Sequence, residues 1–189
     1  FFVILISKLY FRCMSEFRQT TPDDTYFITL TITGWIDLFS KKSYKDIVVE
    51  SLKYCQKSEQ LEIFCYVIMP SHLHMICRRL DNDLNELLGR FKSYTSKMLL
   101  REIESSGNES RKEWLLQQFH AFAKSNKQYS DYYVWQYSNY ATPLFTNEVL
   151  TQKQEYIHQN PVRAGIVVDP CAYLYSSACP ESPLPVIEM

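Results

Sequence analysis

The chain has 189 residues, of which 46% are hydrophobic and 22% charged, and it contains only four glycines. This composition is sufficient for one well-packed domain and argues against a disordered or fibrous chain. The net charge of −1 excludes a uniformly basic nucleic-acid binder, but it allows a protein whose cations gather on one face. Six cysteines without a C-x-x-C pair indicate reduced core thiols in a cytoplasmic protein.

The two ends of the chain read differently from its middle. Residues 1–12 carry six consecutive apolar residues without a basic start, too few for a membrane span of about 20, so neither a signal peptide nor a membrane contact is expected. Because Met14 opens a polar stretch, we expect residues 1–13 to be a non-native leader and residues 14–178 to form a single domain. The proline-rich residues 179–189 are expected to be a tail that wraps the surface or frays.

The first half of the domain alternates strands and a helix. Residues 26–33 alternate apolar and polar side chains, which predicts a half-buried strand. Ser43 could cap a helix whose apolar stripe runs from Tyr44 to Cys55. Residues 61–69 are almost continuously apolar, as expected of a central strand, and they lead through Pro70 and Ser71 into a second strand.

That second strand carries the first candidate site. His72 and His74 are two residues apart, so both side chains point to the same face of the sheet. Paired imidazoles on one face can hold a divalent cation with positions left open for substrate, while Leu73, Met75 and Cys77 anchor the other face. By itself a His-x-His pair is a weak motif, and ordinary surface or core histidines are the competing interpretation.

The second half is mostly helical. Residues 83–103 form a predicted helix with Tyr94 on its apolar stripe, and residues 115–123 form a shorter one. On another face of the first helix Arg90, Lys97 and Arg101 align at intervals of seven and four, where a phosphate backbone or simply solvent could lie. The aromatic residues 132–137, which include Trp135, indicate a strand or an extended crossing.

A last helix is expected from Thr146 or Asn147 to Asn160, where Pro161 would end it. Lys153, Tyr156 and Asn160 share one face of this helix. Leu150 and Ile157 supply a separate apolar stripe that can dock on the sheet, so Tyr156 need not belong to the core.

Three segments together resemble the REP-associated tyrosine transposases of the HUH single-tyrosine superfamily. They are VIMPSHLH at 67–74, YIHQNPVRAG at 156–165 and YLYSSA at 173–178, and their order and separation also fit, so that the resemblance covers about residues 26–178. It implies an α+β fold, a ferredoxin-like α/β sandwich with an antiparallel sheet. This agrees with the strand, helix, strand, strand, helix order predicted above.

The resemblance also implies a metal-dependent DNA transposase. His72 and His74 would be metal ligands, Asn160 the third ligand and Tyr156 the nucleophile, with Mg²⁺ or Mn²⁺ as cofactor. Attack on single-stranded or hairpin DNA would give a 5′-phosphotyrosine and a free 3′-OH, and either a monomer or a homodimer is allowed. The residues expected to contact DNA are Arg90, Lys97, Arg101, Trp135, Lys153 and Arg163.

Two other functions remain open at this point. A domesticated, sequence-specific DNA-binding protein would keep the fold without mobility. A metal-dependent nuclease would use the histidines to activate water, and Tyr156 would be dispensable. Tyr94 has basic neighbours, but its predicted place in the core argues against it as the nucleophile. His120 and His158 are left without a role.

Overall fold

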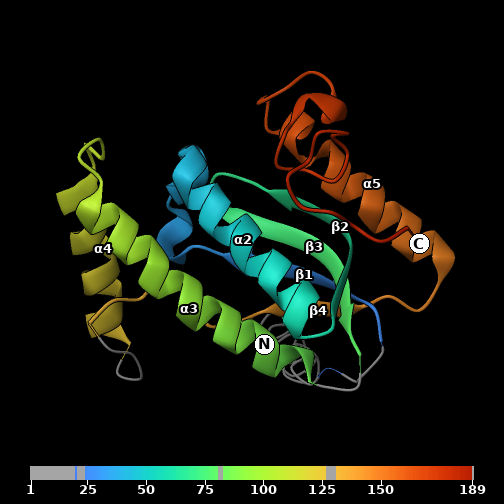
Figure 1. Cartoon of the computed structure of the whole chain (residues 1–189), viewed down its shortest axis with the longest axis horizontal. Helices are drawn as coiled ribbons and strands as arrows, with labels where there is room; N and C mark the ends of the chain where they lie inside the picture. Colours follow the sequence, from blue (N-terminus) through green and yellow to red (C-terminus); the bar gives the residue numbers. More distant parts are fainter. Residues whose placement is uncertain (1–19, 21–23, 81–82, 127–130, 189) are drawn as a thin grey trace, which may run out of the picture.

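The computed structural model describes residues 20, 24–80, 83–126 and 131–188 (Figure 1). The proposed leader at 1–13 lies outside the described residues. Among the helices of the described part, none has the length and apolarity that a membrane span requires. The strands are β1 (Tyr26–Thr31), β2 (Leu61–Ile68), β3 (His72–Arg79) and β4 (Tyr140–Pro143), the helices are α2 (Lys42–Ser58), α3 (Leu84–Ser105), α4 (Lys112–Ser125) and α5 (Asn147–Arg163), and short 3-10 turns are η1 (Thr33–Trp35), η2 (Leu38–Ser40) and η3 (Pro170–Ala172).

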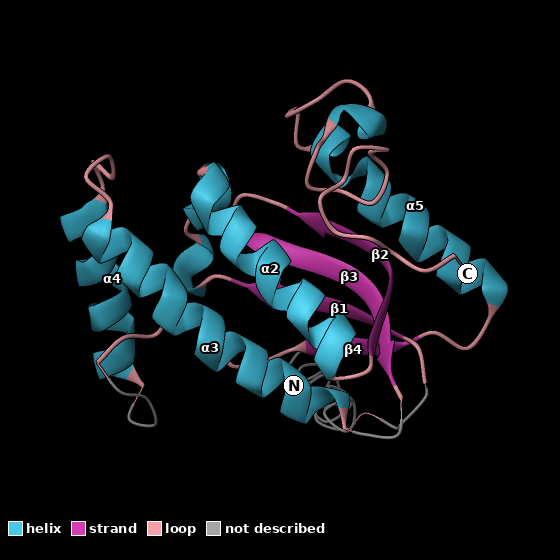
Figure 2. Cartoon of the chain, in the orientation of Figure 1, coloured by secondary structure: helices cyan, strands magenta, loops and turns pink. Residues whose placement is uncertain are grey.

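The four strands form one antiparallel sheet in the order β2-β3-β1-β4. In Figure 2, α2 and α3 lie in front of the strands, and α5 packs against β2 and β3. This is the predicted ferredoxin-like α+β sandwich, with α4 added between α3 and β4. Since neighbouring strand residues face opposite ways, β3 sends Leu73 and Met75 to one face and His72 and His74 to the other.

The core confirms most of the predicted periodicity. Ile28, Leu30 and Ile32 are fully buried or nearly so, as the alternation in residues 26–33 predicts. Phe27 and Thr31 on the other face are buried as well, so the strand is not half-buried as predicted. Every fourth residue of α3 from Leu87 to Leu99 is buried, which gives the helix its apolar stripe. The thiols of the cysteines at positions 55, 65 and 77 are buried and unpaired, as expected of reduced core residues.

β2 is an edge strand of the sheet, and not a central strand as its apolar run predicted. Its outer edge is covered by the C-terminal segment, defined here as residues 173–188. The backbone N–H of Ile68 donates to the carbonyl of Tyr175 at 2.9 Å, and that of Ile187 donates to the carbonyl of Ile63 at 2.9 Å. The segment therefore shields β2 from water much as another strand would, and its described part wraps the surface.

Two further predictions need correction, and one open alternative is resolved. Tyr94 is 56% exposed, because the buried stripe of α3 passes through Thr95 and leaves Tyr94 on its flank. Residues 132–137 form an extended crossing that is hydrogen-bonded to β1 and η1, and the fourth strand is Tyr140–Pro143.

The last helix does not end before Pro161, as predicted, but continues to Arg163. Pro161 lies in its final turn, where only one backbone donor is lost. The carbonyls of Asn160, Pro161 and Val162 accept closing bonds from the next residues, and Gly165 reverses the chain with a φ of +68°.

Candidate active site

The two histidines of β3 converge as predicted. Their ring centroids are 4.6 Å apart. A hydroxyl lies beside the Nδ1 atom of each ring, Thr29 Oγ1 at 2.9 Å from His74 and Ser71 Oγ at 3.1 Å from His72. These contacts fix the ring orientations and leave both Nε2 atoms for another partner, which is how metal-binding imidazoles are commonly held.

Burial keeps both imidazoles neutral. It lowers the pKa of His74 to about 3, with smaller contributions from His72 and the Lys153 cation. Burial also lowers the pKa of His72, which Asp37 opposes. A neutral imidazole is the form that binds a metal ion, so the electrostatics favour ligation at neutral pH.

Tyr156 reaches the same place from α5. Ile157 is fully buried and anchors the helix, while the ring of Tyr156 is half-buried and lies edge-on to His74, with ring centroids 5.4 Å apart. Phe27 completes the cluster, since its ring stacks on His74 at 5.3 Å and meets Tyr156 edge-on at 6.0 Å. The predicted nucleophile and the histidine pair are thus brought together on one face of the sheet.

Two cations flank the Tyr156 ring. Lys153 Nζ lies 4.7 Å from the centroid of Phe27 and 5.7 Å from that of Tyr156. The guanidinium carbon of Arg163 lies 5.4 Å from the Tyr156 centroid. A phosphate approaching the phenol would meet positive charge from these two side chains.

Asn160 follows Tyr156 by one turn of α5 and is half-buried, and its side-chain amide makes no hydrogen bond with another described residue. Within the described part of the chain, no group of three or more His, Cys, Asp or Glu residues could hold a metal ion. A site at the histidine pair would therefore need a third protein ligand of another type. The amide oxygen of Asn160 is chemically suited to Mg²⁺ or Mn²⁺, so the residues present fit the expected metal.

His158, which the sequence left without a role, ties α5 to its surroundings. Its Nε2 atom lies 3.2 Å from Cys65 Sγ on β2 and 3.0 Å from Ser177 Oγ in the C-terminal segment. Burial raises the pKa of Cys65 to about 12, so this thiol is not a nucleophile. The contact instead holds the helix that carries Tyr156 against the sheet. In the sequence, this role of His158 is indicated only by its position two residues after Tyr156.

No protein-family model and no curated protein sequence matches the chain. A solved structure of a REP-associated tyrosine transposase bound to a REP hairpin does match, with a TM-score of 0.60 and 15% sequence identity, over 83% of this chain and 78% of that chain. The chain has the fold of a REP-associated tyrosine transposase.

Within the REP-associated transposase fold, the predicted basic row on α3 does not meet the histidine pair. α3 covers the opposite face of the sheet (Figure 2). Lys97 and Arg101 are exposed and form no ion pair with other described residues, whereas Arg90 donates to Glu86 at 2.8 Å and to Glu59 at 2.5 Å.

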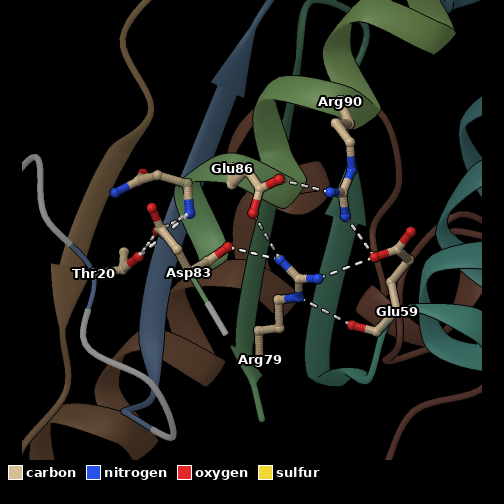
Figure 3. A network of polar contacts seen from close by, with 7 residues as sticks. Thr20, Glu59, Arg79, Asp83, Glu86 and Arg90 are labelled. Carbon is tan, nitrogen blue, oxygen red and sulfur yellow. Dashed lines mark hydrogen bonds and ion pairs between the residues drawn. The ribbon is translucent and has the colours of Figure 1, made fainter. Parts of the chain in front are cut away.

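Figure 3 shows Arg90 in a network around the buried Arg79. Arg79 donates to the carboxylate of Glu59 at 3.0 Å and to the carbonyl of Asp83, at the start of α3, at 2.9 Å. The network joins the ends of α2, β3 and α3. The charge of Arg90 is already matched within the protein, which corrects its expected place in an open cationic row.

Trp135 was expected to stack on DNA, but only 3% of it is exposed. Its indole N–H donates to Thr95 Oγ1 at 2.9 Å, and its ring packs against Phe39 and Phe91. This tryptophan belongs to the core and is unavailable for stacking. The exposed tryptophan beside the histidines is Trp35, whose ring lies edge-on to His72 with centroids 5.5 Å apart.

Proposed function

We propose that the chain is a DNA endonuclease and strand transferase that acts on hairpin DNA with a single-stranded flank, through a 5′-phosphotyrosine intermediate. The observation that carries this proposal is the contact between the Tyr156 ring and His74, beside His72, on one face of the sheet. The solved structure with the same fold is a tyrosine transposase bound to a REP hairpin, which supports a hairpin substrate here.

Tyr156 would supply the nucleophilic oxygen. A phenol has an unperturbed pKa of about 10, so it must lose its proton as it attacks phosphorus. A bond forms between the phenolic oxygen and phosphorus while the bond to the 3′-oxygen breaks, and the departing oxygen takes up a proton. Lys153 and Arg163, whose cations lie 5.7 and 5.4 Å from the centroid of the Tyr156 ring, would hold the scissile phosphate.

His72, His74 and Asn160 would hold the Mg²⁺ or Mn²⁺ ion. When bound, this cation polarises the scissile phosphate and offsets its developing negative charge. Thr29 and Ser71 keep the two imidazoles oriented, and burial keeps them neutral. Lys97 and Arg101 remain proposed contacts for a more distant part of the DNA backbone.

Trapping a covalent adduct tests the proposal. A hairpin labelled on either side of the cut is incubated with protein and Mn²⁺ and run on a denaturing gel. Wild-type protein should retain only the label 3′ of the cut, because tyrosine holds the 5′-phosphate. Tyr156→Phe should bind the hairpin without cutting it, and the matched control Tyr94→Phe, at an exposed tyrosine of α3, should behave as wild type.

The other outcomes identify the competing functions. Cutting by Tyr156→Phe without attached protein would show a nuclease that activates water. Binding without any cutting by wild type would indicate a DNA-binding protein that has lost the reaction. Adduct formation by Tyr156→Phe would assign the nucleophile to another residue.

A further inference from the structure

A cleft of about 480 Å³ opens near His72, whose ring is in edge-on contact with the cleft residue Trp35. One wall is the turn that follows β1, and the other is the start and middle of α4. Trp35 connects the cleft to the site, because this residue lines the cleft and its ring meets His72 edge-on. The lining residues are Gly34, Trp35, Ile36, Asp37, Arg111, Trp114, Gln118 and Phe122.

Two tryptophans with exposed side chains are among the residues that line this cleft. Trp35 is 59% exposed and Trp114 47% exposed, whereas Trp135, the remaining tryptophan of the chain, is buried. Exposing so much aromatic surface is unfavourable in water unless a ligand covers it. The two side chains are therefore candidates for contact with a flat, apolar ligand.

The backbone under Trp35 is held in an unusual conformation. Trp35 has a φ of +56°, in a region that bulky residues rarely occupy, and it follows Gly34 with a φ of +68°. A Cβ atom on Gly34 would lie 2.7 Å from the Phe122 ring, so the turn also needs glycine for its close approach to α4. The flanking Ile32 and Ile36 are buried and fix the turn on both sides.

Arg111 adds a rigid polar group. Its guanidinium donates to the Asp37 carbonyl at 3.2 Å, to Ser40 Oγ at 3.2 Å and to Glu109 Oε1 at 3.3 Å. Three of its five N–H groups are thereby used, and the planar group is fixed with donors left for a ligand. Together with Gln118, it gives the cleft polar groups beside its aromatic walls.

We propose that this cleft binds one unpaired nucleobase of the single-stranded flank, next to the phosphodiester that Tyr156 attacks. The inference rests on the proposed function, because that function puts single-stranded DNA at the histidine pair. A nucleobase has two flat apolar faces and a polar edge, which matches the exposed rings of Trp35 and Trp114 and the polar groups of Arg111 and Gln118. Trp35 is a stacking residue in this arrangement and takes no part in bond making.

The test compares the loss of hairpin affinity when one base of the flank is removed with the loss of affinity when the Trp35 indole is removed. Binding of a fluorescent hairpin is measured in the uncleaving Tyr156→Phe background, with an abasic residue moved through the flank one position at a time. One position should weaken binding roughly 10-fold or more. Trp35→Ala should weaken binding of the intact flank by a similar factor and remove the abasic penalty at that position, while Trp35→Phe should retain most of the affinity.

Tyr54→Ala is the matched control, since it removes an exposed aromatic ring from α2 outside the cleft and should change nothing. Trp114→Ala serves as a second variant at the opposite wall and should reduce the same abasic penalty. Melting temperatures of all variants are measured as a check on the fold, which we expect to be retained because both indole rings are exposed.

Failure of this inference is distinguishable from failure of the proposed function. Suppose that the hairpin is cut through a tyrosine adduct, but that neither Trp35→Ala nor an abasic residue at any flank position weakens binding. The subsite is then wrong and the proposed function stands. If the abasic penalty depends on Trp35 but no adduct forms, the subsite stands and the reaction is wrong. If Trp35→Ala alters the oligomeric state and not DNA affinity, the cleft is a protein interface and the inference is overturned.

Discussion

Replacing His158 with alanine should slow strand cleavage while leaving hairpin binding nearly unchanged. His158 touches no atom of the proposed reaction centre, but its Nε2 atom is the polar link between α5, β2 and the C-terminal segment. Tyr156 lies half a turn earlier on the same helix, so its position against His74 depends on how firmly that helix is held. His158 would thus be a positioning residue.

The size of the effect follows from the contacts. One ring nitrogen shares its single donor or acceptor site between Cys65 and Ser177, which is worth about one hydrogen bond, or 0.5–1.5 kcal/mol. Adding the partly buried ring, we expect His158→Ala to reduce the free energy of unfolding by about 1–2 kcal/mol and the melting temperature by roughly 2–8 °C. A displacement of Tyr156 by an ångström could cost about 100-fold in the cleavage rate.

Single-turnover adduct formation at saturating hairpin and Mn²⁺ measures the cleavage rate apart from DNA affinity. His158→Gln, whose amide can occupy much the same place as Nε2, should restore part of the rate. A variant of His120, which lies on α4 and contacts the Asp131 carbonyl, provides a histidine control. If His158→Ala melts at a lower temperature but forms adduct at the wild-type rate, the positioning argument is refuted.

Two further predictions concern the histidines and an acidic side chain. His72→Ala and His74→Ala should both lose Mn²⁺ binding in calorimetric titrations and all cleavage, but His74→Ala should also lose roughly 1–3 kcal/mol of stability because its ring is buried. Glu109 is buried, which alone would raise its pKa, but hydrogen bonds from the Arg111 backbone, from Tyr44 and from the Arg111 side chain lower that pKa to about 2. The folded state therefore prefers ionised Glu109, so this stabilisation is complete above the ordinary pKa of about 4.3 and is lost as the pH falls toward 2. Glu109→Gln should make the melting temperature less dependent on pH in the acid range and should lower the free energy of unfolding at pH 7 by about 2–3 kcal/mol. An unchanged dependence of the melting temperature on acid pH would contradict the role given to Glu109.

The sequence was sufficient for elements whose local period decides their environment. The alternation in β1 predicted its buried aliphatic residues, and the spacing in α3 predicted most of its buried stripe, with Tyr94 as the exception. Prediction failed where a distant segment decides. β2 is almost continuously apolar because both α2 and α5 pack against it, and its edge is covered by residues more than a hundred positions later. Trp135 is buried against α3, where Thr95 accepts its N–H. Neither partner is visible in the local pattern.

Charge spacing has the same weakness. Arg90, Lys97 and Arg101 are aligned on α3, as a helical period requires, but alignment does not reveal which cations are already paired. Glu86 is one turn from Arg90 and could have been recognised as its partner. Glu59, at the end of α2, could not, because the loop geometry that brings it beside Arg79 and Arg90 is tertiary.

The polar face of β1 shows how sheet register completes the site. Thr29 and Thr31 alternate with apolar residues and so suggest a face in contact with water, yet Thr31 is only 3% exposed. The antiparallel register places Thr29 opposite His74 and Thr31 opposite His72, so the threonines are the cross-strand neighbours of the two imidazoles. Apolar residues on this face of β1 would bury the His74 ring without a partner for its Nδ1 atom, at the cost of an unsatisfied polar group. The threonine at position 29 meets that need and orients the ring, so a polar residue on a buried strand face is here a consequence of the site that the strand carries.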